Sequence, residues 1–243
     1  MKRKGVKMEE LDNTIDAYVN NNIVSVAKLE NDEYKNIFNK FYPFFKRLLD
    51  IIAGICGSLI IIPLFLIIKI IYMLNKDFAP IMFKQQRVGK NGKIFSMYKF
   101  RTMVVDADRI LIDMLKNEEL RKEWEENQKF HNDPRITKCG NILRKTSLDE
   151  IPQFFNLLKG DMSLIGPRPL VKGELLDHNG NPNIYEKVRP GISGLWASTG
   201  RSQISYEERL MLEYEYVENY SFKMDMKCVI NTIHAVITKK GAK

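Results

Sequence analysis

An uncharged apolar segment, from Ile51 to Ile68, constrains the fold of this chain more than any other feature of its sequence. Its length is about what a helix needs to cross the hydrocarbon core of a bilayer. The segment begins too far from Met1 to be a signal peptide, and no small-residue cleavage site follows it. A buried core helix is the alternative, but the segment is apolar on all sides rather than along one stripe. We therefore expect a membrane-embedded helix.

Pro63 and the flanking charges bear on whether this helix crosses the membrane. Proline removes a backbone donor and predicts a kink, near which Ser58 is expected to help satisfy polar backbone groups. A helix-break-helix that enters and leaves by the same face would keep both flanks on the cytoplasmic side, as the positive-inside rule requires, whereas a single spanning helix would not. The basic flanking residues include Lys46, Arg47, Lys69 and Lys76.

The sequence divides into three parts. Residues 1–39 are polar and rich in asparagine and are interpreted as an N-terminal appendage, residues 40–76 as the re-entrant membrane hairpin, and residues 77–243 as a cytoplasmic domain. Strand-like runs joined by a glycine-containing turn predict a β-hairpin over residues 81–101. The expected fold class is α+β, with a mostly helical domain. Apolar residues at helical spacing predict helices over residues 106–128, 151–158, 206–218 and 222–237, the last of them amphipathic.

Charge and composition narrow the kinds of partner and site. The chain has 38 Lys and Arg against 30 Asp and Glu, and its net charge of +8 suits an anionic partner. No nucleic-acid-binding module is apparent, so we expect the anion to be a phosphorylated substrate or acidic lipid rather than nucleic acid. The cysteines and histidines are scattered, which argues against a disulfide framework and a zinc site. Any essential metal is then expected to have oxygen ligands, as Mg²⁺ does.

The segment LRKTSLDEIPQFFNLLKGDMSLIGPRPL, residues 143–170, carries the residues best suited to chemistry. Asp149 and Glu150 are adjacent carboxylates at the expected start of a helix, and Ser147 with Glu150 matches a capping box. Near the positive end of a helix dipole a carboxylate such as Asp149 can attack phosphorus as a nucleophile. The alternative is that the two acids only cap the helix. Positive charge, which such an attack needs, comes from Arg144, Lys145 and Arg168.

The order of motifs along the chain resembles that of the bacterial sugar transferase family. The motifs are the basic-flanked apolar segment, QQRVGKNGKIFSMYKFRTM, LRKTSLDEIPQFFNLLKGDMSLIGPRP and RPGISGLWASTGRSQISYEERL, and the resemblance covers about residues 44–240. It implies an enzyme of the inner (cytoplasmic) membrane whose catalytic domain faces the cytoplasm. Such an enzyme moves a sugar phosphate from a UDP-sugar to undecaprenyl phosphate and releases UMP, the first membrane step of exopolysaccharide, capsule or O-antigen synthesis.

The same resemblance assigns roles to individual residues. It implies that Asp149 is the nucleophile and forms a covalent phosphosugar intermediate, that Glu150 assists it, and that Asp149 also contacts a Mg²⁺ ion that bridges the diphosphate. It supports the re-entrant helix, although Ile62 stands before Pro63 where smaller members have serine. Basic residues of the KFR, LR, PRP and GR motifs are expected to contact phosphate or uridine: Lys99, Arg101, Arg144, Arg168 and Arg201.

The resemblance also suggests a donor and partners. Residues 104–150 resemble larger members that transfer galactose phosphate, so UDP-galactose is the first expected donor, with UDP-glucose or an N-acetylated sugar next. The expected partners are the UDP-sugar, undecaprenyl phosphate and membrane lipid, and a homodimer is left open. Two other functions stay open. A non-catalytic membrane adaptor that binds acidic lipids or polysaccharide-assembly partners would release no UMP, and a nucleotide-sugar hydrolase would need no lipid phosphate.

Overall fold

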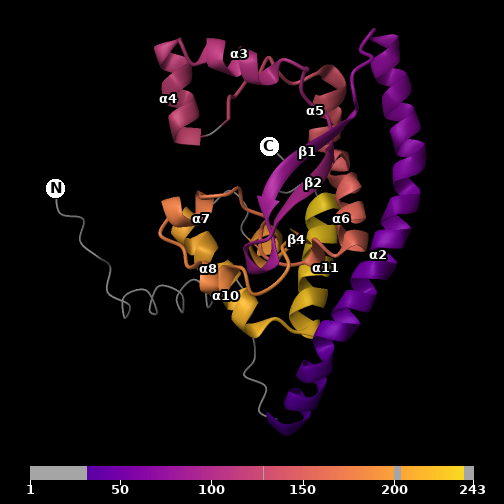
Figure 1. Ribbon diagram of the computed structural model, residues 1–243, viewed down its shortest axis with the longest axis vertical. Coiled ribbons are helices and arrows are strands. Elements are labelled where there is room, and N and C mark those ends of the chain that lie inside the picture. Colours follow the sequence, from indigo (N-terminus) through magenta and orange to yellow (C-terminus); the bar gives the residue numbers. More distant parts are fainter. Residues whose placement is uncertain (1–31, 128, 200–203, 238–243) are drawn as a thin grey trace, which may run out of the picture. The chain divides into compact units, whose positions relative to one another are not determined.

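A computed structural model describes residues 32–127, 129–199 and 204–237 (Figure 1). The chain divides into two compact units, each assembled from segments that are separated in the sequence. Most of the predicted appendage, residues 1–39, lies outside the described residues. The two units cut across the domain boundaries expected near residues 40 and 77. The terminal unit contains the described parts of residues 32–50, 87–94 and 161–237, and the central unit contains those of residues 51–86 and 95–160.

The apolar segment lies within one helix, α2, which runs from Asp32 to Leu74 (Figure 1). The break expected at Pro63 is not formed, because α2 continues through the proline. Ile61 and Ile68 lie on either side of Pro63 and are buried in one apolar cluster, which offsets the lost backbone hydrogen bond. The Oγ atom of Ser58 is buried and has no hydrogen-bond partner among the described residues, so the backbone contact expected of it is also not made.

The outer face of α2 is apolar from Phe41 to Leu74. Phe44, Leu59 and Leu74 are 70%, 65% and 79% exposed, respectively. By length and composition, the part of α2 from Phe41 to Leu74 is long and apolar enough to cross a membrane. So much exposed apolar surface on one helix is suited to contact with lipid.

The predicted β-hairpin is confirmed. Strand β1 (Met82–Val88) and strand β2 (Ile94–Phe100) form a two-stranded sheet, joined through the short 3₁₀ helix η1 (Lys90–Gly92). Asn91 has φ 57° and Gly92 has φ 73°, the left-handed backbone that asparagine and glycine adopt most readily. The Asn-Gly pair therefore fixes this turn, as its sequence predicts.

The single helix expected over residues 106–128 is two helices, α3 (Ala107–Met114) and α4 (Glu118–Asn127). The break falls at Asn117, whose side-chain oxygen accepts hydrogen bonds from the backbone N–H groups of Glu119 and Leu120 at 2.9 and 3.2 Å. An asparagine that caps the following turn starts a new helix, although the apolar spacing continues across it.

The remaining helices of the central unit are α5 (Lys138–Lys145), the 3₁₀ helix η2 (Leu148–Gln153) and α6 (Phe154–Lys159). Helix α6 packs closely on α2 through two glycines. A Cβ atom on Gly57 would lie 2.2 Å from the ring of Phe154, and one on Gly54 would lie 2.8 Å from Leu158. The core of this unit comprises Ile61, Ile68, Tyr72, Ile81, Phe100 and Leu143.

The terminal unit contains a second, parallel pair of strands that the sequence did not predict. Strand β3 (Ser163–Ile165) pairs with β4 (Gly191–Ser193), with Ser163 opposite Gly191. A Cβ atom on Gly191 would lie 2.2 Å from the backbone nitrogen of Gly166, so the close approach requires glycine.

Two helices of the terminal unit pack against this pair and bind the beginning of α2. The predicted C-terminal helices are confirmed as α10 (Tyr206–Asn219) and α11 (Phe222–Ile237). Asp225 of α11 accepts hydrogen bonds from Tyr42 and Lys46 of α2, and one of 2.7 Å from Tyr216 of α10. Three short helices complete this unit: α7 (Glu174–Asp177), α8 (Pro182–Tyr185) and α9 (Leu195–Thr199).

Candidate active site

The acidic pair lies in η2, directly before α6. Ser147 has a left-handed backbone, with φ 56°, and its side chain makes no capping hydrogen bond, so the predicted capping box is not formed. The side chain of Glu150 instead accepts a hydrogen bond from Lys99, with 2.8 Å between Nζ and Oε1. The acids therefore belong to a 3₁₀ turn rather than to the first turn of an α-helix, and Glu150 contacts a strand.

A buried asparagine holds that strand against the helix that follows the acidic pair. The side chain of Asn156 in α6 is fully buried; it accepts a hydrogen bond from the backbone of Tyr98 at 3.0 Å and donates one to the carbonyl of Ser96 at 2.8 Å. The side chain of Asn156 thus makes hydrogen bonds with the backbone of β2 that a neighbouring strand would otherwise make. Because Lys99 follows Tyr98 directly, this anchor fixes the position from which Lys99 reaches Glu150.

Asp149 is partly buried beside charges of both signs. Burial raises the pKa of its carboxyl, and the adjacent Glu150 raises this pKa further, while Lys99 and Arg144 lower it. Poor solvation makes a carboxylate a stronger nucleophile, and the two cations stabilise its ionised form. The Asp149 carboxyl thus lies close to one acidic neighbour and two cations.

Arg144 is held at the end of α5 with its side chain exposed. Its Nε donates a hydrogen bond of 2.9 Å to Thr102, and the start of the same helix is capped by Thr137. A Cβ atom on Gly140 would lie 1.9 Å from the backbone oxygen of Thr102, so α5 can approach this strand end only through glycine. Lys99, Arg144, Asp149 and Glu150 are thus brought together within the central unit.

Arg101 occupies a different environment from the predicted one. It is buried, and its guanidinium donates two hydrogen bonds of 2.9 Å to Asp77, one of 2.8 Å to the carbonyl of Pro80 and one of 3.1 Å to that of Met103. It also lies 4.5 Å from the ring centroid of Tyr72. These contacts join the end of β2 to the end of α2, and they favour a structural role for Arg101 over the expected substrate contact.

Two residues expected to contact the substrate remain, Arg201 and Arg168. Arg201 is outside the described residues. Arg168 is in the terminal unit, where its side chain is exposed and its guanidinium carbon lies 5.6 Å from the ring centroid of Trp196. Its backbone N–H donates a hydrogen bond of 3.1 Å to Glu213. Burial raises the pKa of Glu213 to about 7. Glu213 was not expected from the sequence, where it is one of several glutamates in the helix predicted over residues 206–218.

The donor atoms of the acidic pair can be compared with the needs of Mg²⁺. Among the described residues, no group of three or more His, Cys, Asp and Glu side chains is placed to hold a metal ion. Mg²⁺ is often bound by one or two carboxylates together with phosphate oxygens of a substrate. Asp149 and Glu150 supply such carboxylates, so the site suits a Mg²⁺ ion that arrives with a diphosphate.

The chain is similar to known proteins over most of its length. Residues 41–239 match the family described as bacterial sugar transferase. Over 231 residues the chain is 39% identical to the undecaprenyl-phosphate galactose phosphotransferase of Salmonella typhimurium, covering 95% of this chain and 47% of that protein. Over 227 residues it is 36% identical to the UDP-galactose-lipid carrier transferase of Erwinia amylovora, covering 93% and 46%. The chain therefore spans about half the length of these relatives.

A shorter relative is matched over most of its length. The exopolysaccharide production protein ExoY of Rhizobium meliloti is 38% identical over 198 residues, which cover 81% of this chain and 87% of that protein. The matched region of the family includes the acidic pair, both strands of the hairpin and all the basic residues discussed above. The chain belongs to the bacterial sugar transferase family.

Proposed function

We propose that this chain is a phosphoglycosyl transferase that moves a hexose 1-phosphate from a UDP-sugar to undecaprenyl phosphate and releases UMP. The observation that carries the proposal is the pairing of Asp149 and Glu150 with Lys99 and Arg144, inside the region that matches the family. An acidic pair that only capped a helix would not need cations from two other elements. A membrane adaptor would not need them either.

In the first step, a carboxylate oxygen of Asp149 attacks the β-phosphorus of the UDP-sugar. The bond from that phosphorus to the bridging oxygen breaks, UMP leaves with the bond's electrons, and the sugar phosphate stays on Asp149. Lys99 and Arg144 stabilise the charge that accumulates when one anion approaches another. Arg168 and Arg201, from the PRP and GR motifs, are proposed to contact the donor.

In the second step, an oxygen of undecaprenyl phosphate attacks the same phosphorus. The bond to Asp149 breaks, which restores the carboxylate and yields the lipid diphosphate sugar. Glu150, which accepts a hydrogen bond from Lys99, is proposed to assist this exchange by accepting a proton from the lipid phosphate. Mg²⁺ held by Asp149, when bound, would supply Lewis-acid stabilisation of the diphosphate.

We further propose that α2 is embedded from the cytoplasmic side of the inner membrane without crossing it. Tyr42 and Lys46 precede the apolar segment, yet both contact Asp225, which follows it. A segment that crossed the membrane once would separate these residues by the bilayer. Basic residues on both flanks favour the same topology. A tag at each end of the chain tests it: in intact spheroplasts, external protease should remove neither tag, and removal of one would contradict it.

The proposed donor is UDP-galactose, because two of the relatives described above carry galactose or UDP-galactose in their names. UDP-glucose and N-acetylated sugars are the next candidates. The testing experiment measures UMP release by detergent-solubilised protein with Mg²⁺ from a panel of UDP-sugars, with and without undecaprenyl phosphate. Lipid-dependent release from one donor is the expected result. Release without lipid would indicate a hydrolase, and no release from any donor would favour an adaptor.

A further inference from the structure

Helix α11 has apolar residues on two of its faces. Its inner face packs in the terminal unit, where Cys228 is buried in an apolar cluster and Met224 and Val229 pack against that cluster. The residues of its outer face recur at every third or fourth position and are 40–61% exposed: Phe222, Met226, Ile230 and Ile233. A helix that only packed on a domain would have polar residues on this outer face. Helix α11 is therefore suited to contact on both sides.

These four residues form the outer row of α11. From Phe222 to Ile233 the row extends about 17 Å along the helix, at about 1.5 Å per residue. Single exposed apolar residues are ordinary on a protein surface, whereas a continuous row of this length marks a contact surface. The proposed transfer uses no residue of α11, so that reaction does not account for the row.

The beginning of α11 is fixed to the beginning of α2 within the terminal unit. Asp225 of α11 accepts hydrogen bonds from Tyr42 and Lys46 of α2. The rings of Phe222 and Tyr42 meet edge to face, with 6.3 Å between their centroids. The first residue of the outer row thus contacts α2 itself.

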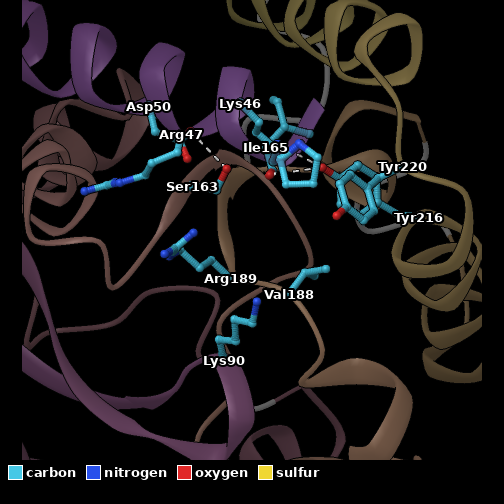
Figure 2. Close-up of a pocket in the computed structure, with 11 residues that line it drawn as sticks. Lys46, Arg47, Asp50, Lys90, Ser163, Ile165, Val188, Arg189, Tyr216 and Tyr220 are labelled. Atoms are coloured by element: carbon cyan, nitrogen blue, oxygen red, sulfur yellow. Dashed lines mark hydrogen bonds between the residues drawn. The ribbon is translucent and has the colours of Figure 1, made fainter. Parts of the chain in front are cut away.

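Helix α10 braces this contact. Lys46 of α2 donates a hydrogen bond of 3.1 Å to the hydroxyl of Tyr216, whose ring centroid lies 6.1 Å from that of Tyr220 (Figure 2). Tyr216 is fully buried and also donates to Asp225 at 2.7 Å. One buried network therefore holds the beginning of α2, α10 and α11 together, so the depth of α2 in a membrane would also set the position of α11.

The apolar surface of α2 continues onto α11. Phe41, Phe44 and Phe45, at the beginning of α2, are exposed. Phe45 lies one helical turn from Tyr42, the residue that Phe222 contacts. This face of α2 is the one proposed above to be embedded in lipid, and its continuity with the outer row favours lipid as the occupant of both.

The charges of α11 favour a bilayer surface over a second copy of the chain. Lys223, which follows Phe222, is exposed, and Lys227, which follows Met226, is half-buried. The one acidic residue in the sequence of α11, Asp225, is buried in the network. Lysines at the edge of an apolar row can extend to anionic headgroups while the apolar side chains enter the acyl region. In a symmetric pair of chains the same lysines would come close to one another and repel.

We propose that α11 lies in the surface of the cytoplasmic leaflet, with its outer row at the acyl boundary and Lys223 and Lys227 at the anionic headgroups. Helices of this kind enter the boundary to a depth of about 5–10 Å. The proposal rests on the proposed embedding of α2 and adds a second contact to it. One embedded helix leaves a domain free to rotate about the helix axis, whereas two contacts fix its orientation. Helix α11 would therefore hold the terminal unit at a set angle to the membrane.

A fluorescent amino acid, introduced at one position at a time into the full chain, tests this contact. The chain is placed in nanodiscs of phosphatidylglycerol whose acyl chains carry bromine near the headgroup, and in unbrominated nanodiscs. Bromine quenches only fluorophores that reach it. Probes in place of Ile230 and of Phe44 of α2 should both be quenched, and a probe in place of Glu215, an exposed residue of α10, should not be.

Two variants, each with the probe in place of Ile230, test the outer row. Met226→Asn/Ile233→Asn should lose more than about half of the quenching, because it removes two apolar side chains from the row. The matched control, Val171→Asn/Leu176→Asn, removes two exposed apolar side chains of the same unit outside α11 and should keep the quenching. All four replaced side chains are exposed, so both variants should unfold near the wild-type midpoint in detergent.

Quenching at Ile230 and Phe44 that only the α11 variant reduces supports the contact, and equal losses in the two variants would overturn it. Quenching at Phe44 without quenching at Ile230 would overturn the contact of α11 and keep the embedding of α2. Absence of quenching at both positions would overturn both. Blue-shifted emission at Ile230 without quenching, lost when each nanodisc holds one chain, would replace lipid by a second copy. UMP release by the unlabelled chain reports on the proposed transfer separately.

Discussion

Two segments of the chain carry the same pattern of a serine followed three residues later by a glutamate, and they fold differently. At Ser205 the pattern forms a capping box: its hydroxyl accepts from the backbone of Glu208 at 3.2 Å, and the Glu208 carboxylate accepts from the Ser205 backbone at 2.7 Å. At Ser147 neither bond forms. Glu150 instead binds Lys99.

The difference has a local and a distant cause. Ser147 adopts a left-handed backbone and Pro152 lies inside the following turn, a combination that gives a 3₁₀ helix in place of the first α-helical turn. Lys99, far away in the sequence, then supplies the partner that Glu150 lacks. Glu150 is therefore satisfied by a partner from another element, Lys99, and not by the helix start. This leaves the acidic pair available for chemistry.

The largest effect should come from replacing Asp149, the first acid after Ser147. Asp149→Asn removes the nucleophile and should lower UMP release by about 10⁴-fold or more. Glu207 holds the corresponding place in the second segment and is exposed, so Glu207→Gln should leave the rate within about twofold. Comparable losses in both variants, or substantial activity in Asp149→Asn, would remove the distinction between the segments.

Lys99 should account for the next largest effect. Lys99→Met should lower the rate by about 10²–10³-fold, because it removes a positive charge beside Asp149 and leaves Glu150 without its partner. The ionised form of Asp149 reacts, so activity is lost as the pH falls through its raised pKa. Since Lys99 lowers this pKa, its loss should move the acid limb of the pH–rate profile to higher pH. Lys84→Met, an exposed lysine of β1, should leave that limb in place.

A buried acid in α10, Glu213, should affect the stability of the fold rather than the rate of transfer. Glu213 is 1% exposed, and burial raises its pKa to about 7 from 4.5. The folded chain then binds more protons than the unfolded chain between these values, so stability should fall as the pH rises through this window, by about 3 kcal/mol. Denaturant unfolding between pH 5 and pH 8.5 should show a smaller fall in Glu213→Gln. The exposed Glu215→Gln should behave like the wild type, and a Glu213→Gln profile parallel to the wild type would refute the assignment.

The smallest effect compares the two serines directly. Ser205→Ala removes a working cap and should lower the free energy of unfolding by about 1 kcal/mol. Ser147→Ala removes no capping hydrogen bond and should cost only the few tenths of a kcal/mol that a left-handed alanine adds. Equal losses in the two variants would mean that the Ser147 box forms in solution.

Much of the fold follows from local sequence. The hairpin is predicted from its strand-like runs and the glycine-containing turn between them, and the two C-terminal helices are predicted from apolar spacing. Family resemblance located Asp149, Glu150, Lys99 and Arg144, and the structure brings these four together. These features depend on residues that are close in sequence or on motifs that are distinctive.

Apart from the local cap at Asn117, what could not be predicted depends on long-range partners. The break at Asn117 required knowing that its side chain would cap, and the continuity of α2 at Pro63 depends on burial of the residues on both sides. The parallel β3–β4 pair joins two three-residue strands that no local pattern marks. Arg101 and Lys99 lie two residues apart in the same KFR motif, yet Arg101 binds Asp77 while Lys99 binds Glu150.

The most direct test of the central claim, that the Asp149 carboxylate is the nucleophile, is peptide mass spectrometry after incubation with the active UDP-sugar and Mg²⁺ in the absence of undecaprenyl phosphate. We expect one sugar phosphate on the peptide that contains Asp149, its disappearance when the lipid phosphate is added, and no adduct in Asp149→Asn. An unmodified peptide from protein that transfers sugar phosphate to lipid, or an adduct on another residue, would contradict the account.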